Sequence, residues 1–517
     1  MKHPTTEPPL GGETAPPAAT TSSSVAAPES AARGRRRLWS GQRPRAALAI
    51  VAGRSAGALA RRLRLGGGTS LPGLVARRLD PQVLAYLGAQ LRHGSVAITG
   101  TNGKTTTSGF AAAVLRRAGL RVWRNREGAN LLRGIAAALI IRGKPTGRLR
   151  RGGDAAAVFE VDEAAFPAVV AELRPRVIAV TNLFRDQLDR YGEVDTVAEH
   201  WRRAISTLAP GAQLVLNADD PAVASLAGSD NAHTTVYFGV EEAPRDDTDA
   251  PDGVARAAVE VVDTRTCPRC RAGLVFSRRF YSHLGHWRCP ACGYARPQPD
   301  VQARAVESEG LDGVRFVLVT PAGERAVHVS LPGLYNVYNA LAAAAVGVAM
   351  GVELTQIREG LERFTPAFGR AERIAAAGRD VRLLLAKNPT GINEVLRALG
   401  AVREPLHLLL ALNDRAADGE DVSWIWDADF ERVAAMPVAA LTVGGTRAYD
   451  LALRLKYAGI AGVGIEPELA PALTLALERT PVGGTLYVIP TYTAMLSVRG
   501  ELERRGYAAP YWEQQDA

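Results

Sequence analysis

Ile98-Thr99-Gly100-Thr101-Asn102-Gly103-Lys104-Thr105-Thr106-Thr107 is the stretch that decides the fold of this chain of 517 residues. An apolar run that starts at Ser95 precedes it, and an alanine-rich helical pattern that ends near Gly119 follows it. We therefore expect a strand, a glycine loop and a helix N-terminus in succession. In such a loop the glycines let main-chain N–H groups close on an anion, and the helix start adds partial positive charge. The agreement between strand, loop and helix favours a phosphate site over a chance glycine-rich turn.

Individual residues of the loop have predictable roles in holding a nucleoside triphosphate. Lys104 stands where the P-loop motif has the lysine that reaches the outer phosphates, and Thr105 stands where the motif has its Mg²⁺-binding hydroxyl. Ile98 fills the position of the first glycine of the general motif, so the match is partial. The predicted phosphate-binding residues are Gly100, Thr101, Asn102, Gly103, Lys104, Thr105 and Thr106.

The composition indicates a globular protein of several domains, with 47% hydrophobic and 22% charged residues. No apolar run reaches the roughly 18 to 20 residues of a membrane span, and residues 1–30 lack the apolar core of a secretory signal, so we expect a cytoplasmic protein. The net charge is +9, and many arginines lie between residues 33 and 64. Such an arm suits an anionic membrane surface or nucleic acid, and a solvated arm is an interpretation of at least equal weight.

The four cysteines form two Cys-x-x-Cys pairs, Cys267 with Cys270 and Cys289 with Cys292, separated by 18 residues. So few cysteines in so long a chain, paired in this way, argue against a disulfide framework, and the spacing predicts a structural Zn²⁺ site with four thiolate ligands. Because the protein fills all four positions, the metal is expected to hold an inserted ribbon together and to take no part in catalysis. We expect His283 and His286 to pack the ribbon.

Polar residues directly after apolar strand patterns are further candidates, because open α/β sheets bind ligands at the carboxyl ends of their strands. Glu160, near the end of the pattern at 156–161, is predicted to bind Mg²⁺ together with Thr105. Surface carboxylates are the alternative interpretation, and it weighs more for Asp162 and Glu163.

Three more features could surround a nucleotide. Asn182 follows the strand pattern at 177–180. The turn at 217–221 either hydrogen-bonds ribose or base, or is a plain Asn/Asp/Pro turn. Asn336 and Asn339 either line one face of a helix start or cap it.

From Arg382 the pattern restarts as a small parallel α/β domain. Its predicted strands are residues 383–386, 407–412, 439–443 and 485–489. The segment 413–427 follows one of these strands and carries five acidic residues and two tryptophans. It is either a solvated loop with a core anchor or, as we favour from its place beyond a strand end, a site or partner surface.

Taken together, the glycine loop, Glu160, Thr181-Asn182 with Asp186, the Asn336/Asn339 pair and Gly369-Arg370 resemble the Mur ligase family. The resemblance implies ATP-dependent phosphorylation of a carboxylate followed by attack of an amine on the acyl phosphate. It also implies that Asn182, Asn336, Asn339 and Arg370 lie near the nucleotide. The resemblance covers roughly residues 45–510.

The resemblance implies an α/β fold with two domains. We expect a disordered Pro/Ala/Ser/Arg-rich tail at 1–44 and a Mur ligase central ATP-binding domain at 45–366. A zinc ribbon is inserted in that domain at about 262–298. A Rossmann-like C-terminal domain at 367–517 follows a hinge at 364–370.

Within the family, the four-cysteine insertion and the segments 184–192, 387–391 and 413–427 resemble the branch that amidates lipid II. This implies conversion of the D-glutamate α-carboxylate of the stem peptide to D-isoglutamine in peptidoglycan synthesis. Gln187 stands where amino-acid-adding members have a metal-binding histidine, and a separate N-terminal domain for a UDP-sugar precursor is not evident. An amino-acid-adding Mur or folylpolyglutamate-type ligase is the alternative.

The cysteine count indicates that the enzyme works with a second protein chain. Hydrolysis of glutamine at a triad-type site needs a cysteine nucleophile, and all four cysteines are assigned to zinc, so ammonia has to come from another chain. The resemblance implies a glutaminase of the GatD type. Asp418 or Asp421 would then orient ammonia or assist the partner's Cys-His pair. A nucleic-acid-binding ATPase is a third class; we expect no nucleic-acid partner, and such a protein would bind with steep salt dependence.

Overall fold

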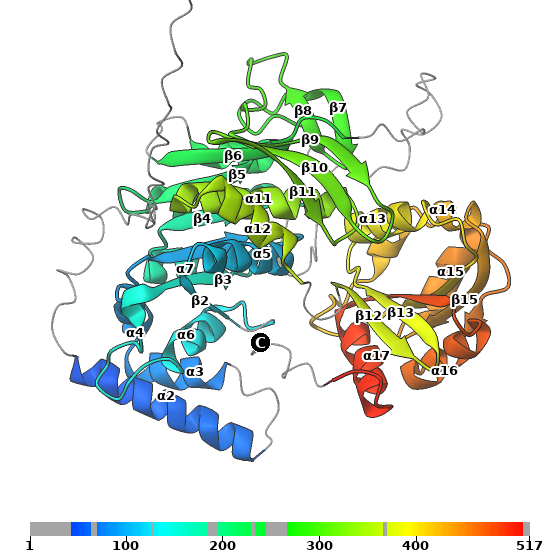
Figure 1. Ribbon diagram of the computed structural model, residues 1–517, viewed down its shortest axis with the longest axis horizontal. Helices are drawn as coiled ribbons and strands as arrows, with labels where there is room; N and C mark the ends of the chain where they lie inside the picture. Colours follow the sequence, from blue (N-terminus) through cyan, green and yellow to red (C-terminus); the bar gives the residue numbers. More distant parts are fainter. Residues whose placement is uncertain are drawn as a thin grey trace, which may run out of the picture.

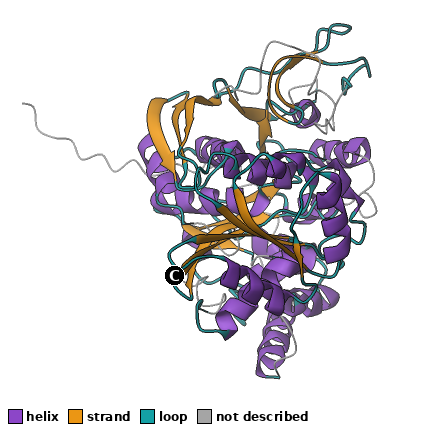
Figure 2. Cartoon of the chain, turned by 90° about the vertical axis from the view of Figure 1, so that its right-hand side faces the viewer, coloured by secondary structure: helices purple, strands orange, loops and turns teal. Residues whose placement is uncertain are grey.

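The structure, a computed structural model, describes residues 43–63, 70–125, 128–184, 194–228, 233–243, 266–365 and 370–509. These residues form two large sheets that lie beside each other, each with helices on both faces (Figures 1 and 2). The predicted α/β class is confirmed. Among the described helices, none is both long and apolar enough to cross a bilayer.

The larger sheet has the strand order β11-β10-β9-β6-β5-β4-β1-β3-β2. Its strands are β1 (Ser95–Thr99), β2 (Arg121–Arg124), β3 (Ala155–Glu160), β4 (Val177–Val180), β5 (Gln213–Asn217), β6 (Thr234–Val240), β9 (Val301–Ser308), β10 (Val314–Thr320) and β11 (Gly323–Val329). Neighbouring strands in the run β9-β6-β5-β4-β1-β3-β2 all pair in parallel, and β10 and β11 add an antiparallel edge. β1, β3 and β4 are buried along their whole length, because helices cover both faces of a parallel sheet.

Two layers of helices enclose this sheet. One face packs against α5 (Lys104–Arg117), α11 (Leu334–Met350) and α12 (Leu354–Glu362). The other face packs against α4 (Val83–Gly88), α6 (Leu132–Ile140), α7 (Phe166–Leu173) and α9 (Val194–Ser206). α2 (Pro44–Arg62) and α3 (Leu71–Leu79) lie outside α6 and form the lower edge of the molecule in Figure 1.

The smaller sheet has the order β12-β13-β17-β14-β15-β16. Its strands are β12 (Arg370–Ala376), β13 (Arg379–Leu384), β14 (Leu406–Ala411), β15 (Val438–Gly444), β16 (Gly464–Ile465) and β17 (Thr485–Pro490). α13 (Pro389–Leu399), α14 (Glu431–Ala434) and α15 (Ala448–Tyr457) cover one face. α16 (Leu469–Arg479) and α17 (Tyr492–Arg504) cover the other. A separate hairpin, β7 (Val275–Tyr281) and β8 (Leu284–Arg288), belongs to the cysteine segment.

The strands predicted at 95–98, 156–161 and 177–180 correspond to β1, β3 and β4. The strand predicted at 383–386 overlaps only the end of β13. Residues 1–42 and 366–369 lie outside the described residues, so the disordered tail and the hinge stay predictions, as do the domain boundaries.

Candidate active site

The glycine loop between β1 and α5 has a backbone that favours glycine at two positions. Gly100 has φ +135°, and Gly103, the residue before α5, has φ +83°. A Cβ atom would lie 2.1 Å from Thr181 Oγ1 at Gly100 and 1.9 Å from Asn339 Oδ1 at Gly103. The loop therefore packs directly on polar neighbours. The first N–H groups of α5 are not used by helical hydrogen bonds, so they can donate hydrogen bonds to a bound anion.

Lys104 is folded over this loop. Its Nζ donates to Gly100 O at 2.6 Å and to Thr101 O at 3.2 Å, and forms an ion pair with Glu163 Oε1 at 2.7 Å. Both ionic side chains are buried, with Lys104 8% and Glu163 6% exposed. Glu163 follows β3, where sequence reasoning gave it little weight because it resembled a surface carboxylate. Its contact with Lys104 makes it part of the site.

Glu160 is the last residue of β3 and lies beside the glycine loop. β3 pairs with β1 so that Glu160 is opposite Ile98. Asn125 fixes its backbone: Glu160 N donates to Asn125 Oδ1 at 3.0 Å, and Asn125 Nδ2 donates to Glu160 O at 2.9 Å. The Glu160 carboxylate and the hydroxyl of Thr105, in the first turn of α5, are hard oxygen donors, so the residues present fit Mg²⁺.

Asn102 connects the loop to two other segments. Asn102 N donates to Asn182 Oδ1 at 2.8 Å, and Asn102 O accepts from Asn182 Nδ2 at 3.1 Å and from Thr181 Oγ1 at 2.9 Å. From the other domain, Asn388 Nδ2 donates to Asn102 Oδ1 at 2.9 Å. Asn182 therefore braces the loop, and the residue before α13 reaches it across the domain boundary.

Asn336 and Asn339 approach the loop from α11. Thr107 Oγ1 donates to Asn339 Oδ1 at 3.2 Å, Asn339 Nδ2 donates to Asn336 Oδ1 at 3.0 Å, and Asn336 Nδ2 donates to Pro332 O at 2.7 Å. Gly333 precedes α11, and no side chain caps that helix. The pair lines the loop side of α11, and the capping interpretation is wrong.

Other predicted site residues are not brought into this network. Arg370 begins β12, but its side chain is outside the description. Gly369, Asp186 and Gln187 lie outside the described residues. Their roles stay predictions.

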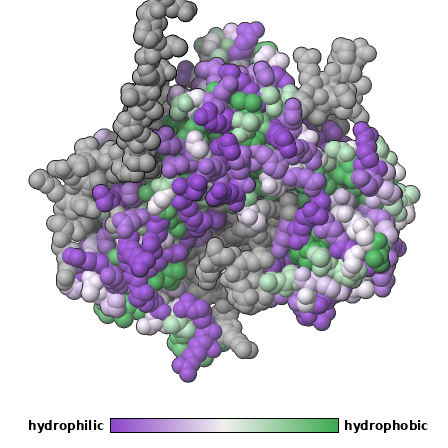
Figure 3. Space-filling view, viewed as in Figure 1, coloured by the Kyte–Doolittle hydropathy of each residue, from purple (hydrophilic) through white to green (hydrophobic). Residues whose placement is uncertain are grey.

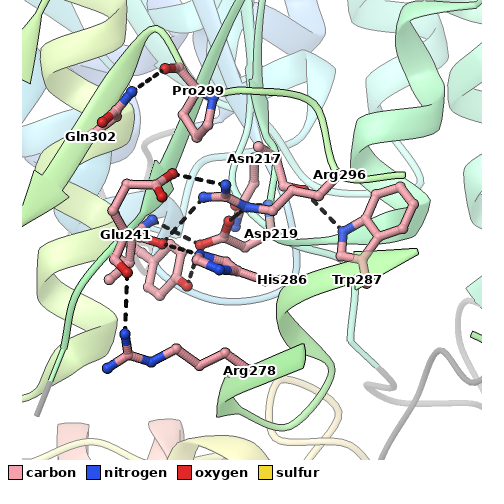
Figure 4. A network of polar contacts seen from close by, with 12 residues as sticks. Asn217, Asp219, Glu241, Arg278, His286, Trp287, Arg296, Pro299 and Gln302 are labelled. Carbon is pink, nitrogen blue, oxygen red and sulfur yellow. Dashed lines mark hydrogen bonds and ion pairs between the residues drawn. The ribbon is translucent and has the colours of Figure 1, made fainter. Parts of the chain in front are cut away.

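The turn at 217–221 is structural. Asp219 is fully buried and accepts from Arg296 Nε at 2.5 Å, from the Tyr338 hydroxyl at 2.6 Å and from Val240 N at 2.8 Å (Figure 4). Burial raises the pKa of Asp219, and the charge of Arg296 opposes that effect. Asp220 caps α10 (Pro221–Ala224) with its carboxylate. Because protein donors occupy both carboxylates, the plain-turn interpretation accounts for them.

The cysteine segment forms a ribbon fixed on this turn. The ligand atoms of Cys267, Cys270, Cys289 and Cys292 lie within 4.8 Å of one another. The Sγ–Sγ distances are 3.6 Å between Cys267 and Cys292 and 3.5 Å between Cys270 and Cys289. A tetrahedron with Zn–S bonds of about 2.3 Å has edges of about 3.8 Å, so the four thiols fit Zn²⁺.

The two histidines of the ribbon pack it, as predicted. His283 is fully buried with Nε2 3.2 Å from Asp220 Oδ2, and His286 Nε2 lies 2.9 Å from Val240 O.

The acidic loop after β14 holds two different carboxylates. Asp418 is buried, accepts from Thr493 N at 2.7 Å and contacts the Thr493 hydroxyl, so it braces the start of α17. Burial raises the pKa of Asp418. Asp421 is exposed and accepts from Ser423 N at 2.8 Å, which lowers its pKa. Of the two, only Asp421 presents its charge at the surface.

Two family models and several known proteins match this chain. The Mur ligase middle domain matches residues 98–261, and the MurT ligase C-terminal domain matches residues 385–495. The chain is 34% identical to the lipid II isoglutaminyl synthase (glutamine-hydrolyzing) subunit MurT of Staphylococcus aureus (strain N315), over 84% of this chain and 93% of the relative. The MurT subunit of Streptococcus pneumoniae (strain ATCC BAA-255 / R6) is 32% identical, over 89% and 97%. The chain belongs to the MurT family.

Solved structures agree with the fold of this MurT-family chain. A pseudomurein peptide ligase type C from Methanothermus fervidus has a TM-score of 0.58 at 25% identity, covering 80% of this chain and 78% of that one. A UDP-N-acetylmuramoylalanyl-D-glutamyl-2,6-diaminopimelate–D-alanyl-D-alanyl ligase from Acinetobacter baumannii has a TM-score of 0.60 at 19% identity, covering 83% of this chain and 80% of that one, which shows the fold alone. The MurT-family chain is a ligase with a Mur ligase fold, as the sequence predicted.

Proposed function

We propose that this chain is the synthetase subunit that amidates the α-carboxylate of D-glutamate in the stem peptide of lipid II. A carboxylate oxygen attacks the γ-phosphorus of ATP, which gives an acyl phosphate and ADP. Ammonia then attacks the acyl carbon, inorganic phosphate leaves and a proton is released, which yields D-isoglutamine. The observation that carries the proposal is the glycine loop with its buried lysine in a chain whose MurT relatives are lipid II isoglutaminyl synthase subunits.

In this mechanism the chain's own groups hold and orient the phosphates. The N–H groups at the start of α5 and Lys104 Nζ bind the β- and γ-phosphates, so Nζ exchanges at least one of its three present acceptors for phosphate oxygen. Thr105 and Glu160 would hold Mg²⁺, which neutralises charge on the transferred phosphoryl group. Asn339 fixes the distance between α11 and the loop.

The nitrogen comes from a second chain in this proposal. All four cysteines lie in the ribbon, which leaves no thiol for a triad-type glutaminase site, and the MurT relatives are subunits of a glutamine-hydrolyzing enzyme. A GatD-type glutaminase is therefore the partner we expect.

The C-terminal domain has a surface suited to that partner. Tyr449, Leu453 and Tyr457 are spaced four residues apart on α15 and are 69%, 48% and 73% exposed. Trp426, 49% exposed, contacts Tyr457 at 5.6 Å between ring centroids. Exposed aromatic clusters of this kind are typical of binding hot spots. Trp426 of the cluster belongs to the same 413–427 loop as Asp421, and we infer that a partner docked on the cluster also approaches that carboxylate.

The test uses the purified chain with ATP, Mg²⁺ and lipid II. With an ammonium salt, we expect phosphate release and the carboxylate-to-amide mass change; with glutamine, both should require the glutaminase. Lys104→Ala should abolish both reactions. Phosphate release that depends on an added amino acid and not on ammonia would favour the amino-acid-adding alternative.

A further inference from the structure

The positive charge of the chain is concentrated in one segment. Residues 30–79 contain twelve arginines and no acidic residue, so the segment carries +12. The remaining 467 residues contain 50 basic and 53 acidic side chains, a net charge of −3. Seven of the twelve arginines lie in the described part of this segment, which consists mainly of α2 and α3, at one edge of the molecule.

α2 has one buried face and one exposed apolar face. Its buried residues are Ala46, Ala49, Ile50, Gly53, Gly57 and Ala60. On the other side, Leu48, Val51 and Leu59 are 61%, 41% and 57% exposed, and Leu63, just after the helix, is 56% exposed. At 100° per residue, Leu48 and Leu59 point within about 20° of each other, so the exposed leucines form a stripe along the helix.

The position of α2 is fixed by close packing. A Cβ atom at Gly53 would lie 2.5 Å from Pro72 O, and one at Gly57 would lie 2.6 Å from Pro72 Cγ. The small residues thus form a tight contact with α3. The leucine stripe is consequently the outer face of a well-seated helix, and turning it inward would break that contact.

Arginines lie on the same helix as the stripe. Arg45 Nε donates to Leu79 O at 2.7 Å and Arg54 Nη1 donates to Gly143 O at 2.7 Å. These carbonyl acceptors carry no charge, so the bonds fix the guanidinium groups without neutralising them. Arg61 and Arg62 add charge in the last turn. Hydrophilic and hydrophobic residues accordingly lie side by side along the lower left edge in Figure 3.

We propose that the outer face of α2 docks on an anionic lipid bilayer. Leu48, Leu59 and Leu63 would enter the headgroup region, and the arginines would meet lipid phosphates. Arginine also binds nucleic-acid phosphates, but the exposed leucines favour acyl chains. The inference rests on the proposed function in one respect, because a lipid-linked substrate gives the ligase a reason to work at a membrane.

The test is sedimentation of the full chain with vesicles of phosphatidylcholine alone or with about one third phosphatidylglycerol. We expect binding to the anionic vesicles only, weakened by salt. Leu48→Glu/Leu59→Glu should lower the bound fraction at least about tenfold. Val482→Glu, at a residue 76% exposed in the other domain, should bind like the wild type.

Amidation of detergent-solubilised lipid II separates this inference from the proposed function, because the double variant should keep that activity. If the double variant is unstable, Arg61→Gln/Arg62→Gln should weaken vesicle binding several-fold instead. The proposal would be overturned if the wild-type chain stayed in the supernatant with anionic vesicles. It would also be overturned if the leucine and arginine variants bound these vesicles as well as the wild type does, or if the chain bound RNA but not vesicles.

Discussion

Glu163→Gln tests the buried ion pair at the centre of the candidate site. Removing one partner of a buried pair typically costs about 3–5 kcal/mol, because the other charge stays buried without compensation. Lys104 would keep its contacts with Gly100 O and Thr101 O, and glutamine would offer a neutral acceptor, so we expect the lower end, about 3 kcal/mol. At about 2 °C per kcal/mol for a large domain, the melting temperature should fall by about 6 °C.

The same substitution should strengthen ATP binding. In the wild type, phosphate oxygens compete for Lys104 Nζ with its three present acceptors, and Glu163, at 2.7 Å, is the only one of the three that carries a charge. In the variant that competitor is neutral, and each 1.4 kcal/mol gained in the free energy of ATP binding lowers the Kd about tenfold. We expect the Kd for ATP to fall about tenfold. Titration calorimetry in Mg²⁺-free buffer without a chelator, which keeps the zinc ribbon intact, would isolate the lysine from any effect on Mg²⁺.

Glu172→Gln is the matched control. Glu172 pairs with Arg77 at 2.6 Å, but the two side chains are 28% and 27% exposed, so this pair should contribute at most about 1 kcal/mol. Its loss should leave the Kd for ATP unchanged. Weaker ATP binding by Glu163→Gln, with an unchanged melting temperature, would refute the reasoning and assign Glu163 to the nucleotide itself.

Three further predictions concern the surroundings of the loop. Asn388→Ala removes a hydrogen bond of about 1 kcal/mol between the domains and should raise the KM for ATP about fivefold. It also removes the side-chain cap of α13 at Gly391 N, so the melting temperature should fall by about 2–4 °C; an unchanged KM would place the contact with Asn102 outside the catalytic cycle. Asp418→Ala should lower the free energy of unfolding by about 1–3 kcal/mol in denaturant titrations, because the Thr493 donors lose their acceptor. Asp421→Ala should keep its stability. It should lose amidation supported by glutamine but keep amidation supported by ammonia. Elemental analysis should find one zinc per chain, and Cys267→Ser should lower both the zinc content and the melting temperature; full zinc occupancy in that variant would contradict the assigned ligands.

Local sequence predicts the central strands well and the edges poorly. β1, β3 and β4 lie between helix layers, so each reads as an uninterrupted apolar run with a polar residue after it. β2 lies at the edge of the sheet and is only four residues long, with arginine at both ends, and such a segment carries no comparable signal. β9 alternates irregularly between buried and exposed residues, and a register shift interrupts its pairing with β10.

Contacts between distant segments limited prediction of the site. The motif identified Lys104, but Glu163 becomes its partner only because the segment after β3 folds towards the loop. Asn388 and Asn102 are 286 residues apart, and their hydrogen bond depends on how the two domains meet. The turn around Asp219 was ambiguous because its main partner, Arg296, lies 77 residues further along the chain, at the end of the ribbon.

The ribbon and the glycine loop share one structural support. Arg296 follows the last cysteine and pairs with Asp219, and Asp219 also accepts from the hydroxyl of Tyr338 on α11. The next residue of that helix, Asn339, fills the space beside Gly103. A fully buried carboxylate cannot lose its counter-charge without a cost of several kcal/mol. Displacement of the ribbon would therefore disturb Asp219 and, through Tyr338, the helix that contacts the glycine loop. The ribbon therefore contributes to the geometry of the candidate active site without presenting a ligand to it.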